Sequence, residues 1–97
     1  MKKGYWIITF RSVSDPAKLA AYIEIAGPVL AAGGARYVAR GMPAKVYEAG
    51  VQERTVVIEF ASVAKAIAVS ESAEYQQSIQ ALGNGAERDV RILEAFE

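Results

Sequence analysis

The sequence predicts an α+β fold whose elements follow the order strand, helix, strand, strand, helix, strand. Three observations support this prediction. Apolar and polar side chains alternate along several short segments, which is the period of a strand. Between these segments, apolar side chains recur at helical spacing. Glycines, prolines and capping residues then separate one segment from the next.

The first strand is expected from Gly4 to Ser12, where successive side chains point to opposite faces. One face is apolar and is expected to cover the core; it consists of Trp6, Ile8 and Phe10. The other face mixes apolar and polar groups; it consists of Tyr5, Ile7, Thr9 and Arg11.

The first helix is expected to begin after Asp15, because an Asp oxygen can accept an unpaired amide hydrogen and Pro16 suits the first helical position. Glycines at 33–34 end this helix. Pro28 lacks a donor, so we expect a kink near Ile25–Gly27. The apolar residues at helical spacing are Leu19, Tyr22, Ile23, Ala26 and Leu30.

Two strands are expected in the middle of the chain. The first runs from Ala35 to Arg40 and continues less regularly through Lys45–Glu48, after a break at Gly41–Pro43. A glycine-containing turn at Ala49–Glu53 leads into the next strand, Arg54–Phe60. In that strand the core face is expected to consist of Val56, Ile58 and Phe60, opposite Thr55, Val57 and Glu59.

The last third of the chain is expected to be helical and then extended. Ser62 can cap a second helix that reaches Val69, and Ser72 can cap a further helical segment that ends at the glycines of 83–85. Arg88–Phe96 is the expected last strand.

These elements together give the ferredoxin-like plan, a four-stranded antiparallel sheet with two helices on one face, and we expect residues 1–97 to form one such domain. Apolar side chains remain on the uncovered face, and such a face is more often buried than left in water. Two sheets are therefore expected to pair face to face as a homodimeric α/β barrel. The uncovered apolar residues are Tyr5, Ile7, Val38, Val57 and Leu93.

The composition excludes several kinds of site. The chain has no cysteine and no histidine, so disulfides, thiolate metal ligands and the commonest general base are all absent. Lys plus Arg and Asp plus Glu both number 11, and no long block of one charge occurs, which argues against nucleic acid as a partner. We expect a cytoplasmic protein with no membrane span, no metal and no cofactor.

Several short motifs occur together along the chain. They are Gly4-Tyr5-Trp6-Ile7, Tyr22 with Pro28 and Gly33-Gly34, Arg40-Gly41, Arg54 leading into Val57-Ile58-Glu59-Phe60, and Ser72-Ala73-Glu74-Tyr75-Gln76. In this combination the sequence resembles the domain-of-unknown-function family 1330, within the dimeric α/β-barrel superfamily. The resemblance covers almost the whole chain and implies a ferredoxin-like protomer and a dimer. It implies little about activity, because one fold hosts many chemistries. The chain departs from the family at Ala73, where a proline is common.

Glu59 is the candidate catalytic residue. Strand alternation places it on the face away from the helices, together with Thr9 and Arg11. Arg36 and Arg40 are expected on the same face. A carboxylate near guanidinium groups in a shared cavity can orient a polar substrate or serve as a general base. The same arrangement is typical of a structural ion pair, which is the simpler explanation.

The candidate ligand-binding residues are Thr9, Arg11, Tyr22, Arg40 and Tyr75. The two tyrosines lie on helical faces beside apolar residues, where a ring can be buried while its hydroxyl reaches a cleft or a backbone group. A structural role is again the simpler explanation for both.

Three functions fit these observations. The first is a small-molecule-binding domain or minor metabolic enzyme, with a pocket between sheet and helices or between protomers. The second, implied by the superfamily resemblance, is a cofactor-independent oxygenase or isomerase acting on small aromatic or polyketide-like molecules. The third is a structural dimerisation protein without a ligand site.

Overall fold

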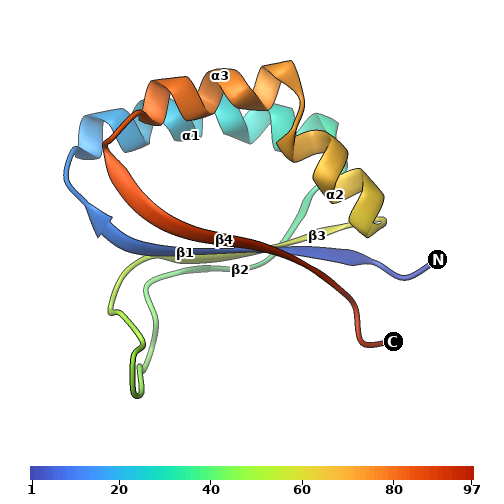
Figure 1. Cartoon of the computed structure of the whole chain (residues 1–97), viewed down its shortest axis with the longest axis horizontal. Coiled ribbons are helices and arrows are strands. Elements are labelled where there is room, and N and C mark those ends of the chain that lie inside the picture. Colours follow the sequence, from blue (N-terminus) through green and yellow to red (C-terminus); the bar gives the residue numbers. More distant parts are fainter.

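The computed structural model describes residues 1–97 and consists of one four-stranded sheet with three helices on one of its faces (Figure 1). The predicted ferredoxin-like arrangement is confirmed, with the second helix divided into two. The strand order is β2-β3-β1-β4, and each neighbouring pair is antiparallel. The elements are β1 Gly4–Val13, α1 Pro16–Ala32, β2 Arg36–Gly41, β3 Thr55–Phe60, α2 Val63–Ser70, α3 Ala73–Leu82 and β4 Ala86–Glu94.

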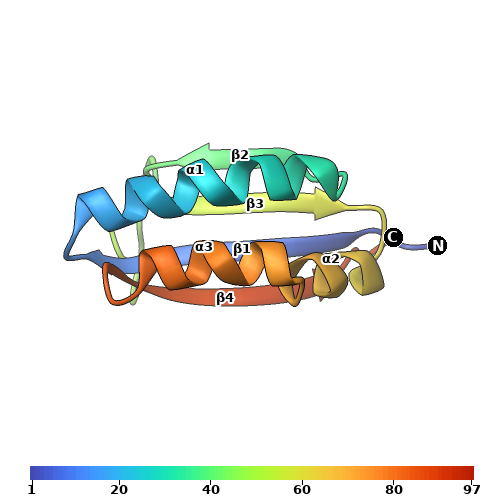
Figure 2. The ribbon, with the colours of Figure 1, turned by 90° about the horizontal axis from the view of Figure 1, so that it is seen from above.

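The helices lie nearly along the strands that they cover (Figure 2). Seen from above, α1 lies over the β2 and β3 side of the sheet, whereas α2 and α3 lie over β1 and β4. The sheet therefore has one covered face and one open face.

The capping residues act as the sequence predicts. The Asp15 carboxylate accepts from the backbone nitrogens of Ala17 and Lys18 at 3.1 and 3.3 Å. Ser62 and Ser72 cap α2 and α3 in the same way. Helix α1 continues through Pro28 to Ala32, so this proline does not end the helix.

The core lies between the sheet and the helices, and the predicted inward faces of β1 and β3 are confirmed. Trp6 and Ile58 are almost completely buried, and Trp6 packs its ring edge-on against Tyr75 with 5.0 Å between ring centroids. The buried residues from the two strands are Trp6, Ile8, Phe10, Val56, Ile58 and Phe60.

The predicted continuation of the second strand through Lys45–Glu48 is wrong. Strand β2 ends at Gly41, whose φ of +142° is unfavourable for other residues, and Pro43 follows shortly after it. Residues 42–54 form a long connection that projects from the sheet on the side away from the helices (Figure 1). The glycine-containing turn lies within this loop, where the Gly50 nitrogen donates to the Tyr47 carbonyl at 2.8 Å.

The face predicted for Arg40 is also wrong. Arg36 pairs with Glu59 and Tyr37 with Ile58, but the register then shifts so that Ala39 pairs with Val57. The extra residue is Val38, and a bulge of this kind reverses the alternation of side chains beyond it. Arg36 therefore keeps its predicted face beside Glu59, whereas Arg40 lies on the helix side, opposite Val56.

The last strand begins two residues earlier than predicted and ends two residues earlier, at Glu94. It pairs along nearly the full length of β1, with Phe10 opposite Arg88 and Trp6 opposite Ile92. Arg88 thus belongs to the covered face. No helix has the length and apolar composition that crossing a bilayer requires.

Candidate functional site

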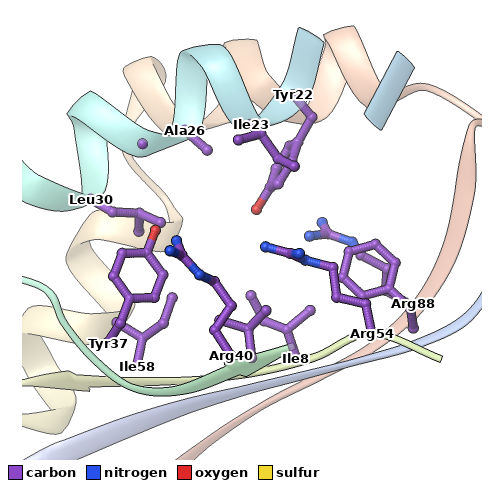
Figure 3. A pocket seen from close by; sticks show the side chains of 13 residues that line it. Ile8, Tyr22, Ile23, Ala26, Leu30, Tyr37, Arg40, Arg54, Ile58 and Arg88 are labelled. Carbon is purple, nitrogen blue, oxygen red and sulfur yellow. The ribbon is translucent and has the colours of Figure 1, made fainter. Parts of the chain in front are cut away.

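A pocket opens between the sheet and α1 (Figure 3). Its empty volume, which includes open solvent at the mouth, is about 430 Å³. Nine of its thirteen lining residues are apolar. The floor comes from the inward faces of β1 and β3, and α1 forms the roof. The apolar wall includes Ile8, Phe10, Val56 and Ile58 from the sheet, and Ile23, Ala26 and Leu30 from α1.

Three arginines extend into this pocket from different parts of the sheet. Figure 3 shows the ends of Arg40, Arg54 and Arg88 spread across the space below the Tyr22 hydroxyl. The bulge in β2 turns Arg40 inwards. Arg54 directly precedes β3, and its carbonyl accepts from the Phe10 nitrogen at 2.9 Å. It therefore continues the inward alternation of that strand.

The three arginines have no carboxylate partner. None of the thirteen lining residues is acidic. The ion pairs of the protein lie elsewhere, at Glu59 with Lys3 and Arg36, and at Asp89 with Arg91. Arg40 instead lies over the ring of Tyr37, with 4.5 Å from its central carbon to the ring centroid. The pocket is therefore apolar in its walls and positively charged.

A buried tyrosine pair borders the pocket. The hydroxyls of Tyr22 and Tyr75 are 2.7 Å apart and share a hydrogen bond. Burial raises the pKa of Tyr75, so its hydroxyl stays protonated at neutral pH. Arg88 lies over the Tyr22 ring at 4.7 Å and near the Phe10 ring at 5.7 Å. Its Nη1 atom is buried and has no hydrogen-bond partner.

Glu59 lies on the open face of the sheet, at the centre of a cluster of donors. Its carboxylate accepts from Lys3 Nζ at 2.9 Å, from Arg36 Nη2 at 3.0 Å and from the Tyr5 hydroxyl at 3.1 Å. Hydrogen bonds from Arg36 and then Lys3 lower the pKa of Glu59 to about 2. A carboxylate with so low a pKa is a weak base at neutral pH. The geometry favours the structural ion pair over the general base.

The structure separates the six candidate residues into two groups. Tyr22 and Arg40 line the pocket, and Tyr75 reaches it through its bond to Tyr22. The other three candidates, Thr9, Arg11 and Glu59, lie away from this pocket. Thr9 donates to the Asp89 carbonyl at 3.4 Å, and with Arg11 it lines a hollow beside the loop of residues 42–54.

Sequence reasoning missed Arg54, Arg88 and Tyr37 as pocket residues. For Arg54 and Arg88 a signal was present, because each shares the alternation of its strand's inward residues. For Tyr37 the same signal was present, because it follows Arg36 and precedes the bulge, so regular alternation places it on the helix side opposite Ile58. No group of three or more acidic residues is placed to hold a metal ion.

Comparison with solved structures supports the fold. A protein of unknown function from Rhodopseudomonas palustris has a TM-score of 0.77 and 15% identity, with 99% of this chain and 84% of that chain covered. A dimeric ferredoxin-like protein of unknown function from Thermobifida fusca has a TM-score of 0.66 and 16% identity over 97% and 92% of the two chains. SnoaB, a cofactor-independent oxygenase from Streptomyces nogalater, has a TM-score of 0.63 and 11% identity over 100% and 96%.

No curated protein is detectably similar to this chain. A family model does match, and it extends over residues 3–96. This range contains all four strands and all three helices. The expected family resemblance is therefore confirmed, and the chain belongs to the family described as domain of unknown function DUF1330.

Proposed function

We propose that this protein binds a small organic molecule in the pocket between the sheet and α1. The observation that carries the proposal is an open, mostly apolar pocket with a few polar groups directed into it. Pockets for small ligands have this character. Tyr22 and Arg40 are the proposed contacts among the predicted residues, with Tyr75 holding Tyr22 in place.

The mouth of the pocket supports the same proposal. Ile23 on α1 and Tyr37 on β2 both line the pocket, although each is more than one third exposed. Large apolar side chains that remain exposed around a cavity are typical of a binding site, because a ligand can cover them.

A plug variant tests this proposal. Gly27 lines the pocket, and a Cβ atom added there meets no atom within 4 Å. Gly27→Leu should therefore fill the cavity without a clash, whereas Ala21→Leu on the exposed side of α1 adds the same bulk outside it. Amide resonances followed by NMR during titration with a library of aromatic fragments should show shifts around the pocket in the wild type and in Ala21→Leu. If Gly27→Leu responds as the wild type does, the pocket is not the binding site.

We further propose that two copies pair through their open sheet faces, with residues 1–97 forming one domain in each. Leu93 is 56% exposed and Val38 47% exposed, and Ile7 and Val57 are only partly covered. The loop of residues 42–54 projects towards the same side and can flank a second sheet (Figure 1). The similar protein from Thermobifida fusca is described as dimeric. In this arrangement Thr9, Arg11 and Glu59 belong to the interface.

Sedimentation velocity tests the pairing. Val57 lies between Ile7 and Ala39 in the ladder of the open face, so Val57→Lys places a charge in the middle of the proposed interface. The expected result is a dimer for the wild type and a folded monomer for Val57→Lys. The control Ile67→Lys adds the same charge on α2, which lies on the helix side, and should stay dimeric. A monomeric wild type at micromolar concentration would contradict the proposal.

Binding is better supported than catalysis. Proton abstraction needs a base within reach of the substrate, but none of the lining residues is Asp, Glu or His. Tyr75 does not supply one, because burial raises the pKa of its hydroxyl. The oxygenase alternative therefore rests only on a likeness of fold to proteins such as SnoaB, and one fold hosts many functions.

A further inference from the structure

We infer that the ligand of this pocket is an amphiphilic carboxylate, with its charged group among Arg40, Arg54 and Arg88 and its apolar body against the floor of the pocket. The inference rests on the proposed function and adds the chemical class of the ligand. It follows from the charge of the pocket, from an unpaired donor inside it and from the nature of its walls.

The charge of the pocket is uncompensated. Arginine stays protonated at any physiological pH, so the three side chains bring three positive charges to one cavity. No acidic residue lines that cavity. The ion pairs of the protein lie outside the pocket, where Glu59 is matched by Lys3 and Arg36, and Asp89 by Arg91. Like charges that face one low-dielectric space favour an anion between them.

Arg88 supplies a donor that no group of the protein satisfies. Its side chain is half-buried and its Nη1 atom is buried without a partner. The rings of Tyr22 and Phe10 compensate part of the charge through their faces, but a ring face does not replace an acceptor for each N–H. A small shift of the Arg88 side chain towards the pocket would let an anionic oxygen there provide that acceptor.

The guanidinium groups suit a carboxylate in particular. A planar guanidinium offers two parallel N–H donors that match the two oxygens of a carboxylate. Arg40 is already stacked on Tyr37, so part of the cost of fixing its side chain is met before the ligand arrives.

The walls of the pocket define the rest of the ligand. The floor and roof are aliphatic and aromatic, and they offer no other charged group and few hydrogen-bonding groups. Such walls favour a hydrocarbon or aromatic body over a sugar or an inorganic anion. The limited volume argues for a single small ring system or a short chain.

A matched pair of probes tests whether binding depends on the negative charge of the ligand. Naphthoate and its neutral amide, naphthamide, have nearly the same shape but only the first is an anion. We expect naphthoate to bind at least about tenfold more tightly than naphthamide. One hydrogen bond to a charged group strengthens binding by roughly tenfold or more. Raising the salt concentration should weaken naphthoate binding and leave naphthamide binding unchanged. Both titrations are followed by NMR shifts of pocket residues.

Three variants refine the test. Arg40→Gln and Arg54→Gln should each weaken naphthoate binding about tenfold while changing naphthamide binding less than about twofold. Lys65→Gln on α2 removes the same charge away from the pocket and should change neither. Circular dichroism verifies that each variant is folded. The salt dependence of naphthoate binding by the wild type tests the inference even if a variant fails to fold.

The outcomes separate the two proposals. If naphthamide binds as tightly as naphthoate, and salt affects neither, the carboxylate inference is wrong while a small-molecule pocket remains. If neither probe shifts the pocket residues, or if Gly27→Leu leaves both titrations unchanged, the proposed function itself fails.

Discussion

Breaking the hydroxyl pair of Tyr22 and Tyr75 tests the packing behind the pocket. Both residues are buried, with 5% and 3% of their surfaces exposed, and their hydroxyls share one hydrogen bond of 2.7 Å. Tyr22→Phe or Tyr75→Phe removes one hydroxyl and leaves the other without its partner, away from water. The double variant removes both hydroxyls together.

The magnitudes follow from the burial of the pair. A stranded buried hydroxyl costs about 1–3 kcal/mol, whereas replacing both partners by apolar groups of the same shape is close to neutral. Each single variant should therefore lower the free energy of unfolding by about 1–3 kcal/mol. In a domain of this size each kcal/mol lowers Tm by roughly 4–8 °C. The double variant should be less destabilised than the sum of the singles by at least about 1 kcal/mol.

Urea unfolding followed by circular dichroism measures these values. Protein concentration must be the same throughout, because self-association makes the apparent stability depend on it. Tyr47→Phe is the control, since Tyr47 is 74% exposed and its hydroxyl faces water. Additive single effects, or single variants within about 0.5 kcal/mol of the wild type, would refute the reasoning.

Three further predictions concern the stability of the fold. Gly4→Ala places a Cβ 2.7 Å from the backbone of residues 62–63 and should cost about 1–3 kcal/mol in urea unfolding, whereas Gly27→Ala meets no atom within 4 Å and should not destabilise. Asp15→Ala removes the cap of α1 and should cost about 1 kcal/mol; an unchanged midpoint would show that the cap is dispensable. The pKa of Glu59 is lowered from 4.5 to about 2, so its contribution to stability is present above pH 4.5 and is lost as the pH falls towards 2. The wild type should therefore lose more stability than Glu59→Gln between pH 6 and pH 3, and equal losses would contradict the ion-pair assignment.

Much of the fold could be predicted because local rules and burial agree. Apolar residues alternate at Trp6, Ile8 and Phe10, and these side chains form the core in the structure. Helix starts were predictable for a similar reason, since a capping side chain acts on amides only two or three residues away. Long-range pairing need not be known for either feature.

The candidate site was less predictable because it depends on register. The sequence contains no clear signal for the bulge at Val38, whose residue type is ordinary for a strand. One extra residue reverses every side chain beyond it, so Arg40 was expected on the same face as Glu59 and is found on the opposite face. The gathering of Arg54 and Arg88 in one pocket also needs the pairing of β1 with both neighbours, which no single segment reveals.

The same bulge divides the charges of the sheet between its two faces. With regular alternation, Arg40 would lie on the open face with Arg36, Lys3 and Glu59, and that face would gain a further cation without a carboxylate partner. Uncompensated charge of that kind opposes burial against a second sheet. The bulge instead moves one cation to the pocket, where it joins Arg54 and Arg88. A single inserted residue thereby favours self-association on one face and anion binding on the other, which links the two proposals to one local feature of β2.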